Sequence, residues 1–406
     1  MSETQRKSHL TVIFMTVFIY LLGFGIVIPI IPLLSRDFGA NALEAGLLLS
    51  AYSLMQFLFS PFWGRLSDRY GRRRILLGCL LGESLTYLLF AVARDLPMLF
   101  AARLLAGFFG ASISTASAAI TDLTPPKERS KGLALIGVAF GLGFMFGPAI
   151  GGLLAMWGKS LSSAPHFQTS FTMSWVSVLC FVTFLFGCRY LPETRKFSDA
   201  PTVKGHRFAS LGNFFSRPVV GTLMAVFFVS SFAMASMEAS LVLYMGDKFS
   251  WGLREVSFGF AYIGVMIVVT QGLIVRRLLP KFGERFTLRL GLASFTLGLA
   301  GIALAPNIGM MAVAMTLLSV GSGLSNPSLL GSISLLSPTE EQGTAMGATQ
   351  SLASLGRILG PAFGGFLFDH LHPTAPFVGG ATFALLALLT VFSLGLRVPD
   401  TARQEA

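Results

Sequence analysis

Apolar runs of roughly 20 residues, the length that a helix needs to cross a bilayer, recur from one end of the chain to the other. The composition agrees with this pattern, because 53% of the residues are hydrophobic and only 12% are charged. A transmembrane β-barrel would show short alternating strands instead. We therefore predict an all-α polytopic membrane protein with twelve transmembrane helices, at about residues 10–33, 45–66, 74–93, 97–120, 132–156, 168–189, 218–242, 256–278, 286–305, 308–335, 343–368 and 375–396.

Helix-breaking residues interrupt one of these runs at 147–152 (GPAIGG), and the same pattern returns 213 positions later at 360–365 (GPAFGG). A proline removes a backbone donor and clashes with the preceding turn, so each copy should bend its helix. The glycines remove side chains from one face, which lets a neighbouring helix approach closely. In the first copy Gly141 and Gly143 extend this face, whereas the second copy carries a charged Arg357. The repeat indicates an internal duplication whose halves have diverged.

The net charge of +11 is distributed as a membrane topology requires. If the amino terminus is cytoplasmic, 23 of the 30 Lys and Arg residues fall on cytoplasmic segments, which is the positive-inside pattern. We expect both termini in the cytoplasm, the inner membrane as the location in a bacterium, contacts with membrane lipid, and no nucleic-acid partner. The remaining seven basic residues are Arg36, Arg94, Lys159, Lys248 and Arg254 on the outside, and Arg103 and Arg357 within helices.

Residue types that carry catalysis or bind metals are scarce. The three cysteines, Cys79, Cys180 and Cys188, lie in or at the ends of predicted helices and lack metal-ligand spacing. The five histidines fall at predicted helix ends or in loops, and the nucleotide-binding pattern GxxxxGKS/T is missing from the sequence. We therefore expect no enzyme, no metal, no cofactor and no ATP-driven transport by this chain.

The loop between the second and third predicted helices, residues 64–74, holds five arginines around a single acid, Asp68. An acid beside several arginines in a short loop is suited to a charge-relay latch at a helix end. The counterpart 212 positions later, residues 276–285, has Pro280 at the position of the acid, so we expect the second latch to be degraded. The predicted latch residues are Gly64, Asp68, Arg69, Gly71, Arg72 and Arg73.

The electrostatics of helix ends indicate a function for Asp68 in the loop at 64–74. A helix amino terminus carries partial positive charge and free N–H groups, both of which an aspartate satisfies. We expect Asp68, held by Arg69 and Arg73, to cap the amino end of the helix at 343–368 when the cavity opens outward.

Several stretches resemble the twelve-helix drug/proton antiporter branch of the major facilitator superfamily, and tetracycline-type exporters above all. The resemblance implies two six-helix bundles, a central cavity and alternating access. We accordingly divide the chain into an N-terminal bundle (1–190), a cytoplasmic linker (191–217) and a C-terminal bundle (218–406). The resembling stretches are the loop at 64–74, the fourth-helix segment 99–111 with Arg103, the first-helix spacing of Gly23, Pro29 and Pro32, and the helix-five antiporter motif of Gly143, Gly147, Pro148, Gly151 and Gly152.

The chain departs from tetracycline-type exporters at two acids. Tyr20 stands where those exporters carry an acid in the first helix, and Thr86 stands where they carry one in the third. An acid does occur one turn before Thr86, at Glu83. Proton coupling must therefore use another set of acids, and the resemblance does not identify tetracycline as the substrate.

Charged residues inside predicted helices are costly unless they face water, the protein interior or a partner. The main ones are Glu83, Arg103, Glu238 and Arg357. A structural pair that fixes helix register is one interpretation of Glu83 with Arg103. The other interpretation makes Glu238 the principal proton carrier, with Glu83 and Arg103 as a coupled pair. Glu83 competes for the principal role, because Glu238 falls toward the outer end of its predicted helix.

The sequence thus favours a secondary active transporter that exports small hydrophobic organic compounds or drugs in exchange for protons by alternating access. Its expected partners are the small-molecule substrate, protons and membrane lipid, and we expect a monomer. A proton-coupled importer or a facilitator of a metabolite, and a non-transporting membrane receptor, stay open as alternatives. The residues expected to line the substrate cavity are Tyr20, Met234, Met237, Gln271 and Arg357.

Overall fold

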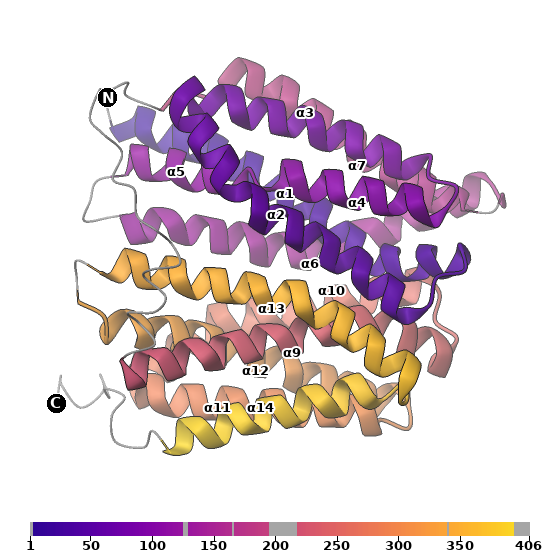
Figure 1. Ribbon diagram of the computed structural model, residues 1–406, viewed down its shortest axis with the longest axis vertical. Coiled ribbons are helices and arrows are strands. Elements are labelled where there is room, and N and C mark those ends of the chain that lie inside the picture. The colour runs from indigo at the N-terminus through magenta and orange to yellow at the C-terminus, as the bar shows by residue number, and fades with distance from the viewer. Residues whose placement is uncertain (1–2, 125–128, 165, 195–216, 339–340, 394–406) are drawn as a thin grey trace. The chain divides into compact units, whose positions relative to one another are not determined.

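The computed structural model describes residues 3–124, 129–164, 166–194, 217–338 and 341–393, and every regular element in these ranges is a helix (Figure 1). The prediction of an all-α membrane protein is confirmed, since eleven helical stretches in this part of the chain are long and apolar enough to cross a membrane. The helices are α1 (Glu3–Asp37), α2 (Ala42–Tyr70), α3 (Arg72–Ala91), α4 (Leu96–Gly110), α5 (Ile113–Leu123), α6 (Arg129–Leu161), α7 (Phe167–Tyr190), α9 (Pro218–Phe249), α10 (Leu253–Val269), the π-helix η2 (Thr270–Val275), α11 (Arg276–Leu304), α12 (Ile308–Leu335), α13 (Gln342–His370) and α14 (Ala375–Ser393).

One of the eleven stretches, Leu253–Leu304, contains 52 residues and covers two of the twelve spans that the sequence predicts. The helical path breaks inside it at Gly283, whose φ of 73° is a left-handed conformation that side chains rarely adopt. Gly71 breaks the chain in the same way between α2 and α3, with a φ of 97°. These two glycines are 212 positions apart, so the duplication extends to the backbone of the loop after the second helix of each half.

The chain forms two compact units, Met1–Asp199 with Ser250–Tyr262, and Ala200–Phe249 with Ile263–Ala406. Within the first unit α1 packs on α6, α3 on α7, and α2 on α4. Within the second unit the equivalent helices pair in the same way: α9 with α13, α11 with α14, and η2 with α12. The linker expected at 191–217 lies mostly outside the described residues, and the division at 190 and 218 stays a prediction.

The fourth predicted helix is broken, in contrast to the single run expected at 97–120. It consists of α4 and α5, which meet at Ala111 and Ser112 and together still form one candidate span. The Ser114 hydroxyl donates to the carbonyl of Ala111 at 2.9 Å, a local bond that competes with the helical backbone pattern.

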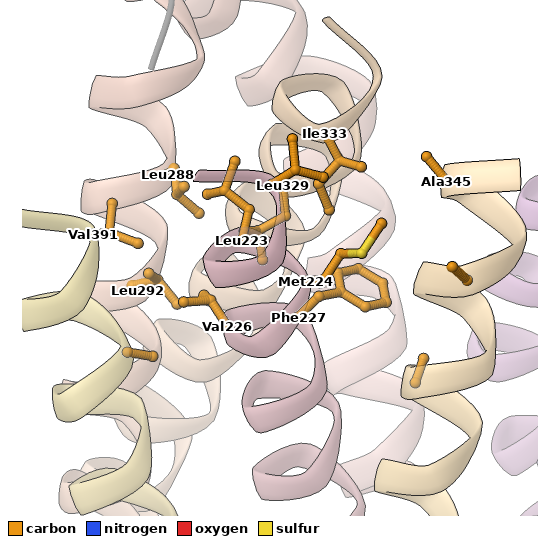
Figure 2. Close-up of a cluster of buried hydrophobic side chains, with 14 residues drawn as sticks. Leu223, Met224, Val226, Phe227, Leu288, Leu292, Leu329, Ile333, Ala345 and Val391 are labelled. Carbon is orange, nitrogen blue, oxygen red and sulfur yellow. The ribbon is translucent and has the colours of Figure 1, made fainter. Parts of the chain in front are cut away.

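The core of the second unit is made by side chains from five of its helices (Figure 2). Leu223 of α9, Leu292 of α11 and Leu329 of α12 are completely buried. Ala345 of α13 and Val391 of α14 belong to the same cluster and lie on its two sides in Figure 2. Burying aliphatic side chains from all five helices ties them into one body.

The glycine-rich faces of α6 and α13 are close-contact surfaces, as a bare helix face predicts. A Cβ atom built on Gly147 would lie 2.7 Å from the backbone carbon of Gly25 in α1. In the second unit, a Cβ atom on Gly360 would lie 2.6 Å from the carbonyl oxygen of Phe232 in α9. Gly141 is a correction to the prediction, because no atom of the described residues lies within 4 Å of its built Cβ and it therefore does not face α1.

Candidate functional site

A carboxylic acid without a hydrogen-bond partner lies inside the first unit. The Glu83 side chain projects from the middle of α3 and is only 1% exposed. Both of its carboxyl oxygens are buried, and neither has a hydrogen-bond partner among the described residues. A buried carboxylate without partners is unfavourable, and taking up a proton removes the charge.

The nearest strong charge to this acid is Arg103 of α4, which is 2% exposed and interacts electrostatically with Glu83. Its Nε donates to the carbonyl oxygen of Leu48 at 3.3 Å. Its Cζ lies 4.6 Å from the ring centroid of Tyr52 in a cation–π contact. The two charges that the sequence pairs, Glu83 and Arg103, are therefore brought together by α3 and α4.

Tyrosine hydroxyls form the polar layer beside this pair. The Tyr20 hydroxyl is hydrogen-bonded to that of Tyr52 and donates to the carbonyl oxygen of Gly110 at 3.1 Å. Gln56 Nε2 donates to the same carbonyl oxygen at 3.2 Å and lies 3.4 Å from each hydroxyl. Tyr20 is buried and its hydroxyl bonds to groups inside the bundle, while its place in the substrate cavity stays a prediction.

Two glycines make room for the tyrosines around the acid. A Cβ on Gly110 would lie 2.9 Å from the Tyr52 hydroxyl oxygen, and a Cβ on Gly23 would lie 2.9 Å from that of Tyr87. Tyr87 is buried one turn after Glu83 on the same helix. The glycine of the first helix therefore has a function that its spacing alone does not reveal.

Half-buried aromatic rings continue this site toward α6. The Phe24 ring lies 5.1 Å from that of Tyr52 and 6.2 Å from that of Phe140, measured between ring centroids. Phe140 and Phe144 are stacked one turn apart on α6. Such rings present a surface that suits flat, apolar molecules.

Tyr52 and Gln56 are functional candidates that the sequence reasoning missed. They are the polar residues of an i, i+4 pair on the apolar helix α2, which places them on one face. That spacing could have identified them, because a polar pair in an apolar span is costly and faces the protein interior.

The predicted latch is a network centred on Arg72. This buried guanidinium donates to Asp68 at 2.6 Å, to Asp122 at the end of α5 at 3.2 Å, and to the Ser67 hydroxyl at 2.6 Å. Asp68 thus pairs with Arg72, whereas we expected Arg69 and Arg73 to hold it. Arg69 lies over the ring of Tyr70 instead.

The amino end of α3 is capped by a residue that follows α7. Glu193 accepts hydrogen bonds from the backbone N–H groups of Arg72 and Arg73, at 2.9 and 3.3 Å. The Arg73 side chain donates to the carbonyl oxygen of Cys188 near the end of α7. Gly71 permits this arrangement, because a side chain there would collide with the Glu193 carboxylate. The predicted latch therefore includes the amino end of α3, whose free N–H groups are capped by Glu193, a side chain more than a hundred residues away in the sequence.

The site residues predicted in the second unit are dispersed along several helices. Glu238 of α9 is half-buried and interacts electrostatically with Arg357 of α13, which also donates to Ser354 at 3.2 Å. Met237 is completely buried, and its place in the substrate cavity stays a prediction. Met234 is half-buried, and Gln271 is exposed within the π-helix η2.

Two similar units of membrane-spanning helices, with charged pairs held inside them, are the architecture of a secondary transporter. The chain belongs to the Major Facilitator Superfamily, whose family model matches residues 13–361 and 273–406. The family predicted from the sequence motifs is therefore confirmed.

Curated relatives cover almost the whole chain. It is 33% identical to the tetracycline resistance protein, class C, of Escherichia coli, over 88% of this chain and 89% of the relative. The class B protein of the same organism is 29% identical over 95% of each chain. Multidrug resistance protein 2 of Bacillus subtilis (strain 168) is 28% identical over 96% of each.

Solved structures share the same fold. The human organic anion transporter MFSD10 (TETRAN) is 25% identical and superposes with a TM-score of 0.69, covering 95% of this chain and 99% of its own. A bacterial homologue of the human lysosomal transporter Spinster, in an inward-facing and occupied conformation, has a TM-score of 0.77 over 97% of each chain. At 15% identity, the second likeness concerns the fold alone.

Proposed function

We propose that this protein is a proton-coupled exporter of small hydrophobic organic compounds, placed in a bacterial inner membrane with both termini in the cytoplasm. The observation that carries the proposal is the buried Glu83, whose carboxyl oxygens have no hydrogen-bond partner in the described part of the chain and which lies beside Arg103. The names of the relatives, which are resistance proteins for tetracycline and for several drugs, favour export over import and over a receptor.

The proton cycle follows from the electrostatics of this pair. With Glu83 ionised, Arg103 supplies the compensating charge inside the bundle. When a proton neutralises Glu83, Arg103 loses its counter-charge. Its guanidinium then keeps the hydrogen bond to the Leu48 carbonyl and the cation–π contact with Tyr52. One proton entering down 100 mV supplies about 2.3 kcal/mol, so each cycle can move substrate outward against a gradient.

Transport into inverted membrane vesicles tests this function. Vesicles that contain the protein should concentrate a lipophilic fluorescent substrate when respiration acidifies their interior, and an uncoupler should release it. Vesicles from cells without the protein are the control. Tetracycline and the dyes used for multidrug exporters form the first panel. Accumulation that persists after the uncoupler would contradict proton coupling, and no accumulation of any compound would contradict export.

The latch network gives a second expected result. Asp68→Asn removes one of the two carboxylates that pair with the buried Arg72, so the guanidinium loses part of its compensation. We expect transport to fall several-fold while the amount of protein in the membrane stays unchanged, because Asp122 still holds Arg72 in the folded unit. Initial rates in the same vesicles measure this.

Arg74→Gln is the matched control, since Arg74 is an exposed cation in the first turn of α3, two residues after Arg72. It should transport at nearly the normal rate. Full activity of Asp68→Asn would mean that the carboxylate has no part in the cycle.

A further inference from the structure

We infer that the segment of α11 that directly follows Gly283, together with the end of α14, binds the headgroup of one anionic phospholipid in the second unit. The residues that form this site, here named the α11–α14 basic site, are Arg285, Arg289, Phe286 and Phe392. It is separate from the transport site proposed above, and the inference does not rest on that function.

Two cations lie close together here, and no acid in the described part of the chain forms an ion pair with them. Arg285 and Arg289 are one turn apart on α11, directly after the break at Gly283, and they repel each other electrostatically. Neither makes an ion pair or a hydrogen bond with a described residue. The Nε of Arg289 is buried and has no hydrogen-bond partner in that part of the chain. A buried donor without an acceptor is costly, and an anion placed against both guanidinium groups would remove that cost.

The nearest acid in sequence does not serve this purpose. Glu284 is buried, and its Cγ lies 3.7 Å from a Cβ atom built on Gly331 of α12. The face of the Arg289 guanidinium is occupied by the Phe392 ring of α14, with Cζ 4.3 Å from the ring centroid. The cation is thereby held where α11 and α14 pack against each other.

Exposed apolar side chains around the cations identify the anion as a lipid. Phe392 is 51% exposed and Phe286 is 47% exposed, and Phe286 lies near Phe282 with ring centroids 4.9 Å apart. Leu288 and Leu292 of the same helix enter the core of the unit, which holds this segment of α11 in place (Figure 2). A free phosphate would gain nothing from exposed rings, whereas a phospholipid places its phosphate on the cations and its acyl chains on the rings.

Lipid retention by the purified full-length protein tests the site. The protein is stripped of lipid in detergent and titrated with phosphatidylglycerol or with phosphatidylcholine, and bound lipid is counted by native mass spectrometry. We expect one phosphatidylglycerol to bind at least about fivefold more tightly than phosphatidylcholine, and Arg289→Gln to remove about fivefold of that affinity. Raised salt should weaken the preference.

Matched variants and ligands distinguish lipid binding at this site from a general charge effect and from the binding of free phosphate. Arg74→Gln removes the same charge from an exposed position of the first unit, so an equal loss in that variant would overturn the site. Arg289→Lys keeps the charge and should retain most of the lipid binding. If the guanidinium had only a structural role, the lysine variant would lose the binding as well. If millimolar inorganic phosphate stabilises the protein as much as the lipid does, the assignment of the anion as a lipid is overturned. Absence of any phosphatidylglycerol preference in the intact chain would overturn it as well, for instance if an acid of residues 394–406 occupies the cations.

Discussion

Replacing Gly147 by leucine is expected to abolish transport and to lower the thermal stability of the protein. A Cβ at this position would lie 2.7 to 2.9 Å from backbone atoms of Gly25 and Ile26, and backbone cannot move aside as the end of a flexible side chain can. The leucine must therefore push α1 away from α6. Overpacking of this kind typically costs about 1–3 kcal/mol, and here it displaces the helix that carries Tyr20.

The same helix provides the control. In the part of the chain that the structure describes, Gly141 has no atom within 4 Å of its built Cβ, so Gly141→Leu adds the same side chain to α6 without a clash there. Flux in vesicles and the melting temperature in detergent are measured for both variants, with Gly147→Ala as an intermediate step. A fully active and stable Gly147→Leu protein would show that α1 and α6 are not held at this distance in the membrane.

The Glu83→Gln protein is expected to lose uphill transport and to keep downhill exchange. A glutamine is neutral, as the protonated acid is, so the site can still change conformation but can no longer carry a proton. A one-proton cycle at 100 mV supports a concentration ratio of about 50, and the variant should fall to a ratio near 1. Accumulation at steady state and counterflow in the absence of a gradient measure the two activities separately.

Glu238→Gln is the competing variant, because Glu238 interacts with Arg357 in the second unit much as Glu83 does with Arg103 in the first. Loss of accumulation in Glu238→Gln alone would move the proton site to α9. If both variants still concentrate substrate, neither acid carries the coupling proton.

Much of the architecture could be predicted from the sequence, because span length and helix breakers are local properties. The length of each apolar run, the glycine faces around Gly147 and Gly360, and the family signature in the loop at 64–74 each depend on a few neighbouring residues. The break between α4 and α5 was missed, because a serine that bonds the preceding turn is locally no different from one that packs.

The site was harder to predict, since its contacts depend on how each helix is rotated. In a span that is apolar on every side, lipid and protein neighbours select similar side chains, so hydrophobicity does not show which face is buried. Charged residues are the exception, and the pairing of Glu83 with Arg103 was predictable for that reason. The hydroxyl network of Tyr20 and Tyr52 and the choice of Arg72 as the partner of Asp68 depend on interhelical geometry that no local pattern contains.

The cap that Glu193 places on α3 has a consequence for how this protein can evolve. Glu193 is the third residue of the connector predicted at 191–217, so the first unit is tied back to its own α3 near the start of that connector. Insertions, deletions or an exchanged sequence in the connector would then transmit no strain to the bundle. We therefore expect this segment to tolerate changes of length, and to accept new regulatory sequences, without a redesign of the membrane-embedded parts.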